Sequence, residues 1–585
     1  MRASPLFLLA FTGLTLLSRE APPRTFRQWL GGQEVGGASL ESKQQGATRE
    51  IRSHEWMVLA RLGQEIRQEV DQTTRKASDG QLTFTWRLQL SAEPFEGRAE
   101  WSPREPKLLS IQPSHGPAVR KEVPTNALLW PEELEGRLKE AARTHRAIQV
   151  TTFSFPVQQW STLHLEPQGP APLPGFPDAV RFTGQESEGS TSAPVEVWIS
   201  PTEGELRHRT EMGGLEVLTQ RSELPAPSPS KMPAEGFFER TLQHLPADPF
   251  QPWMPEFVMQ AEGALPTLPE DAQQIRMSKG RWRLRRAAKP TPFEAAQPAI
   301  TGVPSPEDAR YLAPSALVPF QDPAFDGLLK RMNLLPGLSR WELARRVNAF
   351  VFDWITEKDF TVGFASALEV CHHPRGDCTE HGVLAVALLR RLGVPARGVT
   401  GWVGLGELLG LHFWVEVRLR DRWVPIDPTF DQVPASALRI KLGDTDLADL
   451  GGVGWEGAAQ AFSGLRWTLE KAGTLSLQGD RITGPAGIQL RLPGGRWDLR
   501  QGVLQLRGTK GGPWRIQAVT RPGEAQLKGA TRLAGGQTLR SGWWQSASRT
   551  LWMDLGEGRW IQLDAVSEAE AYDLLDQLTA PTSSS

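Results

Sequence analysis

Residues 376–393 (GDCTEHGVLAVALLRRLG) predict a helix that is apolar on nearly every side. Asp377 is a good N-cap, and Glu380 follows it at the spacing of a capping box. Gly393, followed by Pro395, ends the helix. Because a helix of this kind must be buried, the surrounding domain has to pack other elements against it on several sides.

Cys378 is expected at the first position of this helix. There the positive end of the helix dipole favours the thiolate, which is the reactive form of cysteine. The chain of 585 residues has only one other cysteine, Cys371. The position of Cys378 therefore indicates a nucleophile, and a thiolate nucleophile needs an imidazole that is oriented by a carboxylate.

Two later stretches can supply the imidazole and the carboxylate. Residues 411–419 (LHFWVEVRL) and 422–430 (RWVPIDPTF) predict two strands of a hairpin, separated by a two-residue turn. In that register His412 and Asp427 are diagonal neighbours on one face, roughly 7–8 Å apart at the backbone, a gap that their side chains can close. The sequence thus predicts a Cys-His-Asp triad.

Two other interpretations of the cysteines stay open at this stage. Cys371, His372, His373, Cys378 and His381 are residue types that bind zinc, although they lack C-x-x-C and H-x-x-x-H spacing. A disulfide between the two cysteines would close a short loop and silence the nucleophile. We predict no metal and no other cofactor, and take Cys371 as a spare thiol.

The same motifs resemble the transglutaminase-like superfamily, of a bacterial multidomain type. They occur in the family's order, and the resemblance covers roughly residues 310–445; they are GDCTEH (376–381), LLRRLGVPARGVTGW (388–402), LHFWVEV (411–417) and RWVPIDPTF (422–430). CHHPRGDC (371–378) departs from the family, because it has a second cysteine and two histidines where a plainer loop is common.

This resemblance implies an α+β fold with a papain-like core, in which the helix that begins with the cysteine packs on an antiparallel sheet. It implies Cys378 as nucleophile, His412 as base and Asp427 as the group that orients the base. The reactions it implies are acyl transfers, either transamidation of glutamine or hydrolysis of an amide, with a protein or peptide amide as substrate.

The remainder of the chain predicts β-rich domains on both sides of this core, because many short runs alternate apolar and polar residues. We expect the following organisation: a β-rich N-terminal domain at 45–222, a proline-rich connector with short strands at 223–309, the catalytic domain at 310–445, and a β-rich C-terminal domain with a terminal helix at 446–585.

The first residues have the pattern of a secretory signal. Arg2 precedes an apolar run from Leu6 to Leu17, which is too short to span a bilayer. We therefore predict a signal peptide at residues 1–21 and a periplasmic or extracellular protein, with association to the cell envelope as one option. A short buried helix is the alternative for this run.

Charge gives no reason to expect a nucleic-acid partner. There are 65 basic and 67 acidic residues, for a net charge of −2. The basic run at 276–289 (RMSKGRWRLRRAAK) predicts a strand with one solvated face. We make no prediction of the oligomeric state.

The sequence favours hydrolysis over transfer, because nothing marks a second amine-binding site. The competing hypothesis is a catalytically silent binding or assembly module, since the β-rich regions together outweigh the core.

Overall fold

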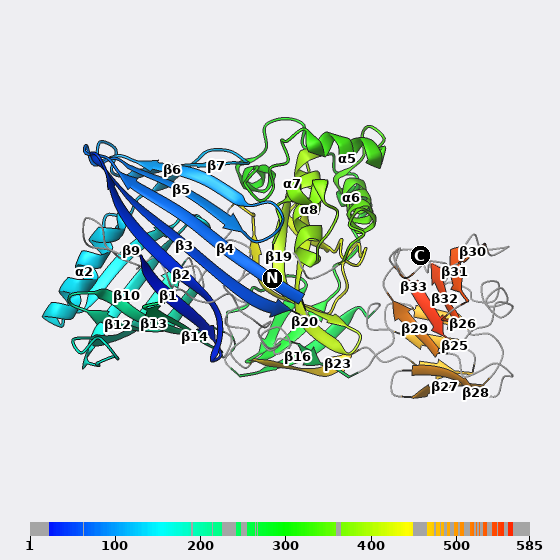
Figure 1. The fold of residues 1–585 in the computed structure, drawn as a ribbon. Coiled ribbons are helices and arrows are strands. Elements are labelled where there is room, and N and C mark those ends of the chain that lie inside the picture. Colours follow the sequence, from blue (N-terminus) through cyan, green and yellow to red (C-terminus); the bar gives the residue numbers. More distant parts are fainter. Residues whose placement is uncertain are drawn as a thin grey trace.

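Antiparallel sheets make up most of the molecule (Figure 1). The computed structural model describes residues 23–448, with gaps at 62–63, 189–190, 213–214, 225–241, 247–253, 264, 266 and 359–363, and parts of residues 465–564. The predicted signal peptide and the predicted terminal helix lie outside the described residues. Among the helices that are described, none is long and apolar enough to cross a membrane.

The N-terminal part of the chain forms a curved sheet that has 14 strands within the described residues. Strands β1 to β8 and β9 to β14 are two runs of sequential neighbours, and they meet where β1 pairs with β14. Helix α2 (Pro131–Thr144) connects the runs and packs on β12 and β13. The strands are β1 (Arg24–Leu30), β2 (Gln33–Gln45), β3 (Thr48–Arg61), β4 (Gln64–Lys76), β5 (Leu82–Gln89), β6 (Phe95–Trp101), β7 (Leu108–Pro113), β8 (Val119–Glu122), β9 (Ile148–Ser154), β10 (Gln159–Pro170), β11 (Val180–Glu188), β12 (Thr191–Ser200), β13 (Gly204–Met212) and β14 (Leu215–Ser222).

The alternation of apolar residues explains these strands. In β5, buried positions alternate with more exposed ones along the whole strand, as the sequence predicts. The sheet begins at Arg24, on the N-terminal side of the predicted boundary at residue 45. A buried Gln28 between Phe26 and Leu30 interrupts the apolar pattern of β1 and hides it in the sequence.

The proline-rich connector contributes to two other sheets. β15 (Gln243–His244) pairs with β20 (Leu408–Leu419), and β16 (Glu256–Glu262) pairs with β18 (Arg281–Arg285) and β23 (Arg466–Ala472). The basic run forms β17 (Gln274–Ser278) and β18, so a strand pair replaces the predicted single strand. The short helices α3 (Pro292–Ala295), α4 (Pro306–Ala309) and η3 (Arg310–Leu312) follow.

Four helices and a sheet form the part that contains the candidate triad. The helices are α5 (Ala324–Met332), α6 (Arg340–Trp354), α7 (Ala367–His372) and α8 (Cys378–Arg391). The other strands of the sheet are β19 (Ala396–Leu405), β21 (Arg422–Ile426) and β22 (Arg439–Thr445), and the order is β15-β20-β19-β22 with β21 on β20. Helix α8 packs against α6, α7, β19 and β20, which explains why it is apolar on nearly every side.

The C-terminal part is also made of strands. Two of its strands form a hairpin, in which Leu551 of β32 pairs with Leu563 of β33. The described strands are β24 (Ser476–Gln478), β25 (Arg481–Gly484), β26 (Ile488–Arg491), β27 (Arg496–Arg500), β28 (Val503–Arg507), β29 (Arg515–Val519), β30 (Thr531–Ala534), β31 (Ser541–Gln545), β32 (Thr550–Asp554) and β33 (Trp560–Asp564).

Candidate active site

Cys378 occupies the first position of α8, as the capping pattern predicts. Asp377 is the N-cap, and both bonds of the capping box with Glu380 are present. The thiol is half-buried. One turn later, Gly382 lets the helix lie against β20, since a methyl group on Gly382 would come within 2.4 Å of the ring of Phe413. Phe413 is the chain neighbour of His412, so α8 lies on the strand that carries the histidine.

The hairpin has the register that the sequence predicts. Leu419 pairs with Arg422, and Val415 pairs with Ile426. Arg420 takes the left-handed conformation that tightens the turn, with φ of 51°. This register brings the strand of His412 alongside the segment that ends in Asp427.

His412 and Asp427 form a buried hydrogen-bonded pair. The Nε2 atom of His412 lies 2.8 Å from Oδ2 of Asp427, and the two residues are 6% and 0% exposed. Because an ionised carboxylate can only accept, the proton of the neutral imidazole is on Nε2. The lone pair on Nδ1 is therefore the one that can take a proton from a thiol.

Two further donors hold the Asp427 carboxylate. The Nη2 atom of Arg439 lies 2.7 Å from Oδ2, and the backbone N–H of Thr429 donates to Oδ1 at 2.9 Å. Burial alone would raise the pKa of Asp427, but the charges of His412 and Arg439 and these hydrogen bonds outweigh burial and hold it well below its usual range. The carboxylate is thus ionised at neutral pH.

Aromatic rings surround the imidazole. The ring centroid of Phe430 lies 5.0 Å from that of His412, and that of Trp414 lies 6.4 Å away. Trp402 faces the other side of the sheet, because it neighbours Gly401, which pairs with His412. There its ring lies 6.0 Å from Trp467, so of Trp402 and Trp414 it is Trp414 that lies beside the pair.

The other candidate zinc ligands face three different partners, and His372 and His373 share one of them, Glu93. The Sγ atom of Cys371 lies 3.6 Å from the carbonyl of Ala324, and His372 lies 3.3 Å from Glu93 of the N-terminal sheet. Nδ1 of His381 donates to the carbonyl of Asp377 at 2.6 Å. Within the described part of the chain, no group of three or more His, Cys, Asp or Glu side chains could hold a metal ion.

The two cysteines are separate thiols rather than a disulfide. Burial, and secondly the charge of Asp322, raises the pKa of Cys371 to about 11. Burial, and secondly Lys358, lowers the pKa of His381 to about 4, so this histidine is neutral at physiological pH.

Two further residues of the site, Arg439 and Gln432, lie outside the sequence motifs. Arg439 lies on β22, and the carboxamide of Gln432 accepts from its Nη2 at 2.9 Å. Gln432 also exchanges both backbone hydrogen bonds with Asp427, at 2.9 and 3.0 Å. No local motif signals these contacts, because they depend on how β22 returns to the sheet.

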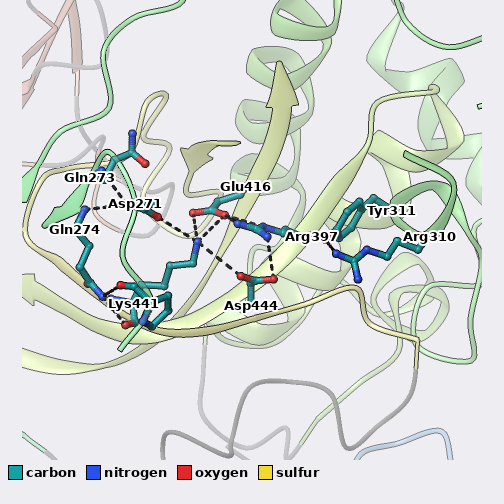
Figure 2. A network of polar contacts seen from close by, with 10 residues as sticks. Asp271, Gln273, Gln274, Arg310, Tyr311, Arg397, Glu416, Lys441 and Asp444 are labelled. Atoms are coloured by element: carbon teal, nitrogen blue, oxygen red, sulfur yellow. Dashed lines mark hydrogen bonds and ion pairs between the residues drawn. The ribbon is translucent and has the colours of Figure 1, made fainter. Parts of the chain in front are cut away.

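A second charged cluster lies on the sheet that carries His412 (Figure 2). Lys441 on β22 lies 3.0 Å from both carboxylate oxygens of Glu416 on β20. Arg397 on β19 lies 2.7 Å from Glu416 and 2.9 Å from Asp444. Asp271 of the connector lies 3.4 Å from Lys441, so the cluster fastens the connector to the sheet.

Comparison with known proteins identifies one segment. Residues 335–428 match the family model described as the transglutaminase-like superfamily. No curated protein matches the chain.

Two solved structures resemble parts of the chain at low scores. A β-barrel-like protein of a domain of unknown function, from Brucella abortus, is 12% identical with a TM-score of 0.28, over 35% of this chain and 98% of its own. A "Putative Cysteine Protease" from Cytophaga hutchinsonii is 14% identical with a TM-score of 0.24, over 40% of this chain and 89% of its own. Neither score supports an argument about the fold. The family match does bear on the motifs, and residues 335–428 are therefore a segment of the transglutaminase-like superfamily.

Proposed function

We propose that this chain is an exported thiol enzyme that hydrolyses an amide of a protein or peptide, with Cys378 as nucleophile, His412 as base and Asp427 as the group that orients the base. The observation that carries the proposal is the buried pair of His412 and Asp427, 2.8 Å apart, in which His412 lies on β20, one of the strands against which the helix of Cys378 packs. The packing of α6 and α8 on this sheet, with α5 and α7 against these helices, supports a papain-like α+β core. Export is proposed from the apolar run at residues 6–17.

In the first half of the reaction, the Cys378 thiolate attacks the amide carbonyl carbon and forms a C–S bond, while the carbonyl electron pair moves to oxygen. Collapse of this intermediate breaks the C–N bond, and the His412 imidazolium gives its proton to the leaving amine. Asp427 keeps Nε2–H engaged, so Nδ1 is the nitrogen that exchanges the proton.

In the second half, water attacks the thioester and His412 takes its proton. The C–S bond then breaks, the acid is released and the thiolate is restored. An amine in place of water would give transamidation by the same steps, and the triad does not distinguish the two acceptors.

A cavity of about 440 Å³ is the place we assign to the substrate chain. One wall comes from the N-terminal sheet, with Arg67, Leu90, Ser91 and Ala92, and the other includes Glu357, Glu369 and Arg375, the last only three residues before Cys378. Volumes of this size are typical of ligand sites, which often lie where two domains meet. The charged lining of both signs suits a polar peptide.

Alkylation of Cys378 by iodoacetamide tests the proposal without a known substrate. We expect the full-length Cys371→Ala protein to be alkylated rapidly well below pH ~8.5, the value of a free thiol. The substitution His412→Ala should slow the reaction, because the thiolate loses its imidazolium partner. Alkylation at the pH of an ordinary thiol, unaffected by His412→Ala, would contradict the proposal.

That contrary result would favour a silent binding or assembly module. The observation behind this second candidate is the extent of the sheets outside residues 335–428, including the 14-stranded sheet of the described N-terminal part. Amide turnover that disappears in a folded His412→Ala protein would exclude it.

A further inference from the structure

A third charged side chain reaches the His412–Asp427 pair from a different strand. The guanidinium of Arg439 on β22 lies 2.7 Å from Oδ2 of Asp427, the same oxygen that accepts from His412. With Thr429 N–H on Oδ1, the carboxylate has three donors. It cannot rotate without losing at least one of them. Arg439 lies outside the matched family segment of residues 335–428.

The guanidinium is itself fixed on two sides. Its Nη2 atom also donates to the carboxamide of Gln432 at 2.9 Å, and Gln432 is paired through its backbone to Asp427. The guanidinium carbon lies 5.3 Å from the ring centroid of Trp414, within cation–π distance. Arg439 is therefore held by two residues that also lie against the pair. Gln432 is bonded to Asp427, and Trp414 lies beside His412.

Stability alone does not explain an arginine at this position. Its side chain is 5% exposed, and Nε and Nη1 have no hydrogen-bond partner among the described residues. Unsatisfied buried donors are unfavourable, and apolar replacements of buried ion pairs often stabilise proteins. Arg390 shows the contrast: it is as deeply buried, but its guanidinium donates to the carbonyls of Ala313, Ala396 and Asp446.

We infer that Arg439 is a positioning residue, which keeps the Asp427 carboxylate ionised and turned toward His412. The inference rests on the proposed function, because it concerns how well the imidazolium of His412 is held beside the Cys378 thiolate. Both contacts come from the single atom Nη2, so a lysine ammonium in its place would keep the charge and has enough donors for both acceptors.

The rate of Cys378 alkylation by iodoacetamide, measured against pH in the full-length Cys371→Ala protein, tests this inference. In Arg439→Met, the pH at which alkylation becomes fast should move upward by about one unit, which is roughly a tenfold slower rate on the acid side. The reason is that a poorly oriented carboxylate stabilises the His412 imidazolium less. This imidazolium is the positive charge that stabilises the Cys378 thiolate. Arg439→Lys should lie close to the parent protein.

Lys441→Met is the matched control. Lys441 lies two residues further along the same strand, is equally buried, and pairs with Glu416 rather than with Asp427. Its loss should lower stability and leave the alkylation profile in place. A shift as large as that of Arg439→Met would overturn the inference, because the effect would then come from any buried charge on β22.

The outcomes separate this inference from the proposed function. Ordinary thiol behaviour in the parent protein would overturn both. Fast, His412-dependent alkylation that is unchanged in a folded Arg439→Met protein would overturn only the role of Arg439. If Arg439→Met does not fold, Gln432→Leu decides the matter: it removes the second anchor of Nη2 and should shift the profile in the same direction by a smaller amount, and an unchanged profile would overturn the inference.

Discussion

Asp427 is a fully buried carboxylate that stays charged because the Arg439 guanidinium and the N–H of His412 contact it. Its pKa is lower in the folded protein than in the unfolded chain, so its ionised form stabilises the fold above the unfolded pKa of about 3.9. That contribution is lost as the pH falls from this value toward the folded pKa. Acid should therefore weaken the fold and the catalytic pair together.

We predict that Asp427→Asn lowers the free energy of unfolding at pH 7 by about 2–3 kcal/mol, because the charge of Arg439 loses its partner. The difference from the parent protein should shrink below pH ~4, where Asp427 of the unfolded chain begins to take up a proton while the folded carboxylate is still ionised. Urea unfolding at neutral and acid pH measures both. A difference that stays constant across this range would contradict the charge assigned to Asp427.

The residues of the candidate triad could be named from the sequence because each belongs to a local pattern. Cys378 follows a capping residue, and His412 and Asp427 are related by a two-residue turn. Arg439 has no such pattern. Its strand reaches the sheet by pairing with β19 across a register shift between Thr400 and Gly401, which no spacing in the sequence reveals.

At the scale of elements, the start of α8 depends on Gly376. Its φ is 137°, and an added Cβ would come within 2.3 Å of the Glu380 side chain that completes the capping box. Burial, and secondly the charge of Asp377, raises the pKa of Glu380. Because this side chain is buried and completes the capping box, it has little room to move away from an added methyl group. The conformation of one glycine thus sets where Cys378 lies.

We predict that Gly376→Ala destabilises the protein by about 1–3 kcal/mol and slows alkylation of Cys378. Gly337→Ala is the control, because Gly337 also has a positive φ, of 78°, but nothing lies near its added Cβ. Thermal unfolding and alkylation of both variants separate strain from the clash with Glu380. Equal effects in the two variants would mean that the Glu380 side chain moves away from the added methyl group, and would contradict the role given to this contact.

Helices and hairpins were predictable where the periodic pattern is strong. In α6 (Arg340–Trp354) buried apolar residues recur at helical spacing after the cap Ser339, and in β5 buried residues alternate with more exposed ones. The pairing of connector strands was not predictable. β15 has two residues, and its partner β20 lies more than 150 residues later in the chain.

At the scale of the whole molecule, the turn between β5 and β6 of the N-terminal sheet contacts the segment that leads to Cys378. Both carboxylate oxygens of Glu369 on α7 accept hydrogen bonds from this turn, one from the Ser91 hydroxyl at 2.6 Å and one from the Ala92 N–H at 3.0 Å. Glu93 faces His372, one of the two histidines by which the loop departs from the family pattern. Those histidines therefore belong to a contact between domains.

We predict that Ala92→Phe, which would place a ring in the cavity assigned to substrate, lowers kcat/KM for amide cleavage by roughly tenfold. Alkylation of Cys378 should not change, since the triad is untouched. Release of new amines from a mixed peptide digest measures turnover. Ser78→Phe, at the exposed turn between β4 and β5, is the control and should behave like the parent protein.

A normal kcat/KM in Ala92→Phe together with rapid alkylation would place the substrate elsewhere while leaving the triad intact. A loss shared by Ser78→Phe would instead indicate damage to the sheet.

The pairing of β15 with β20 limits which fragments containing the candidate triad can be prepared for study. A fragment that starts at residue 310 lacks Gln243 and His244, which cover the backbone of Leu408 and Leu409, and it also lacks Leu245, whose N–H donates to the Glu407 carbonyl. Uncovered strand edges that carry apolar side chains recruit strands from other molecules. Such a fragment would tend to aggregate through the strand that holds His412, and a fragment meant for crystallisation or assay should begin before residue 243.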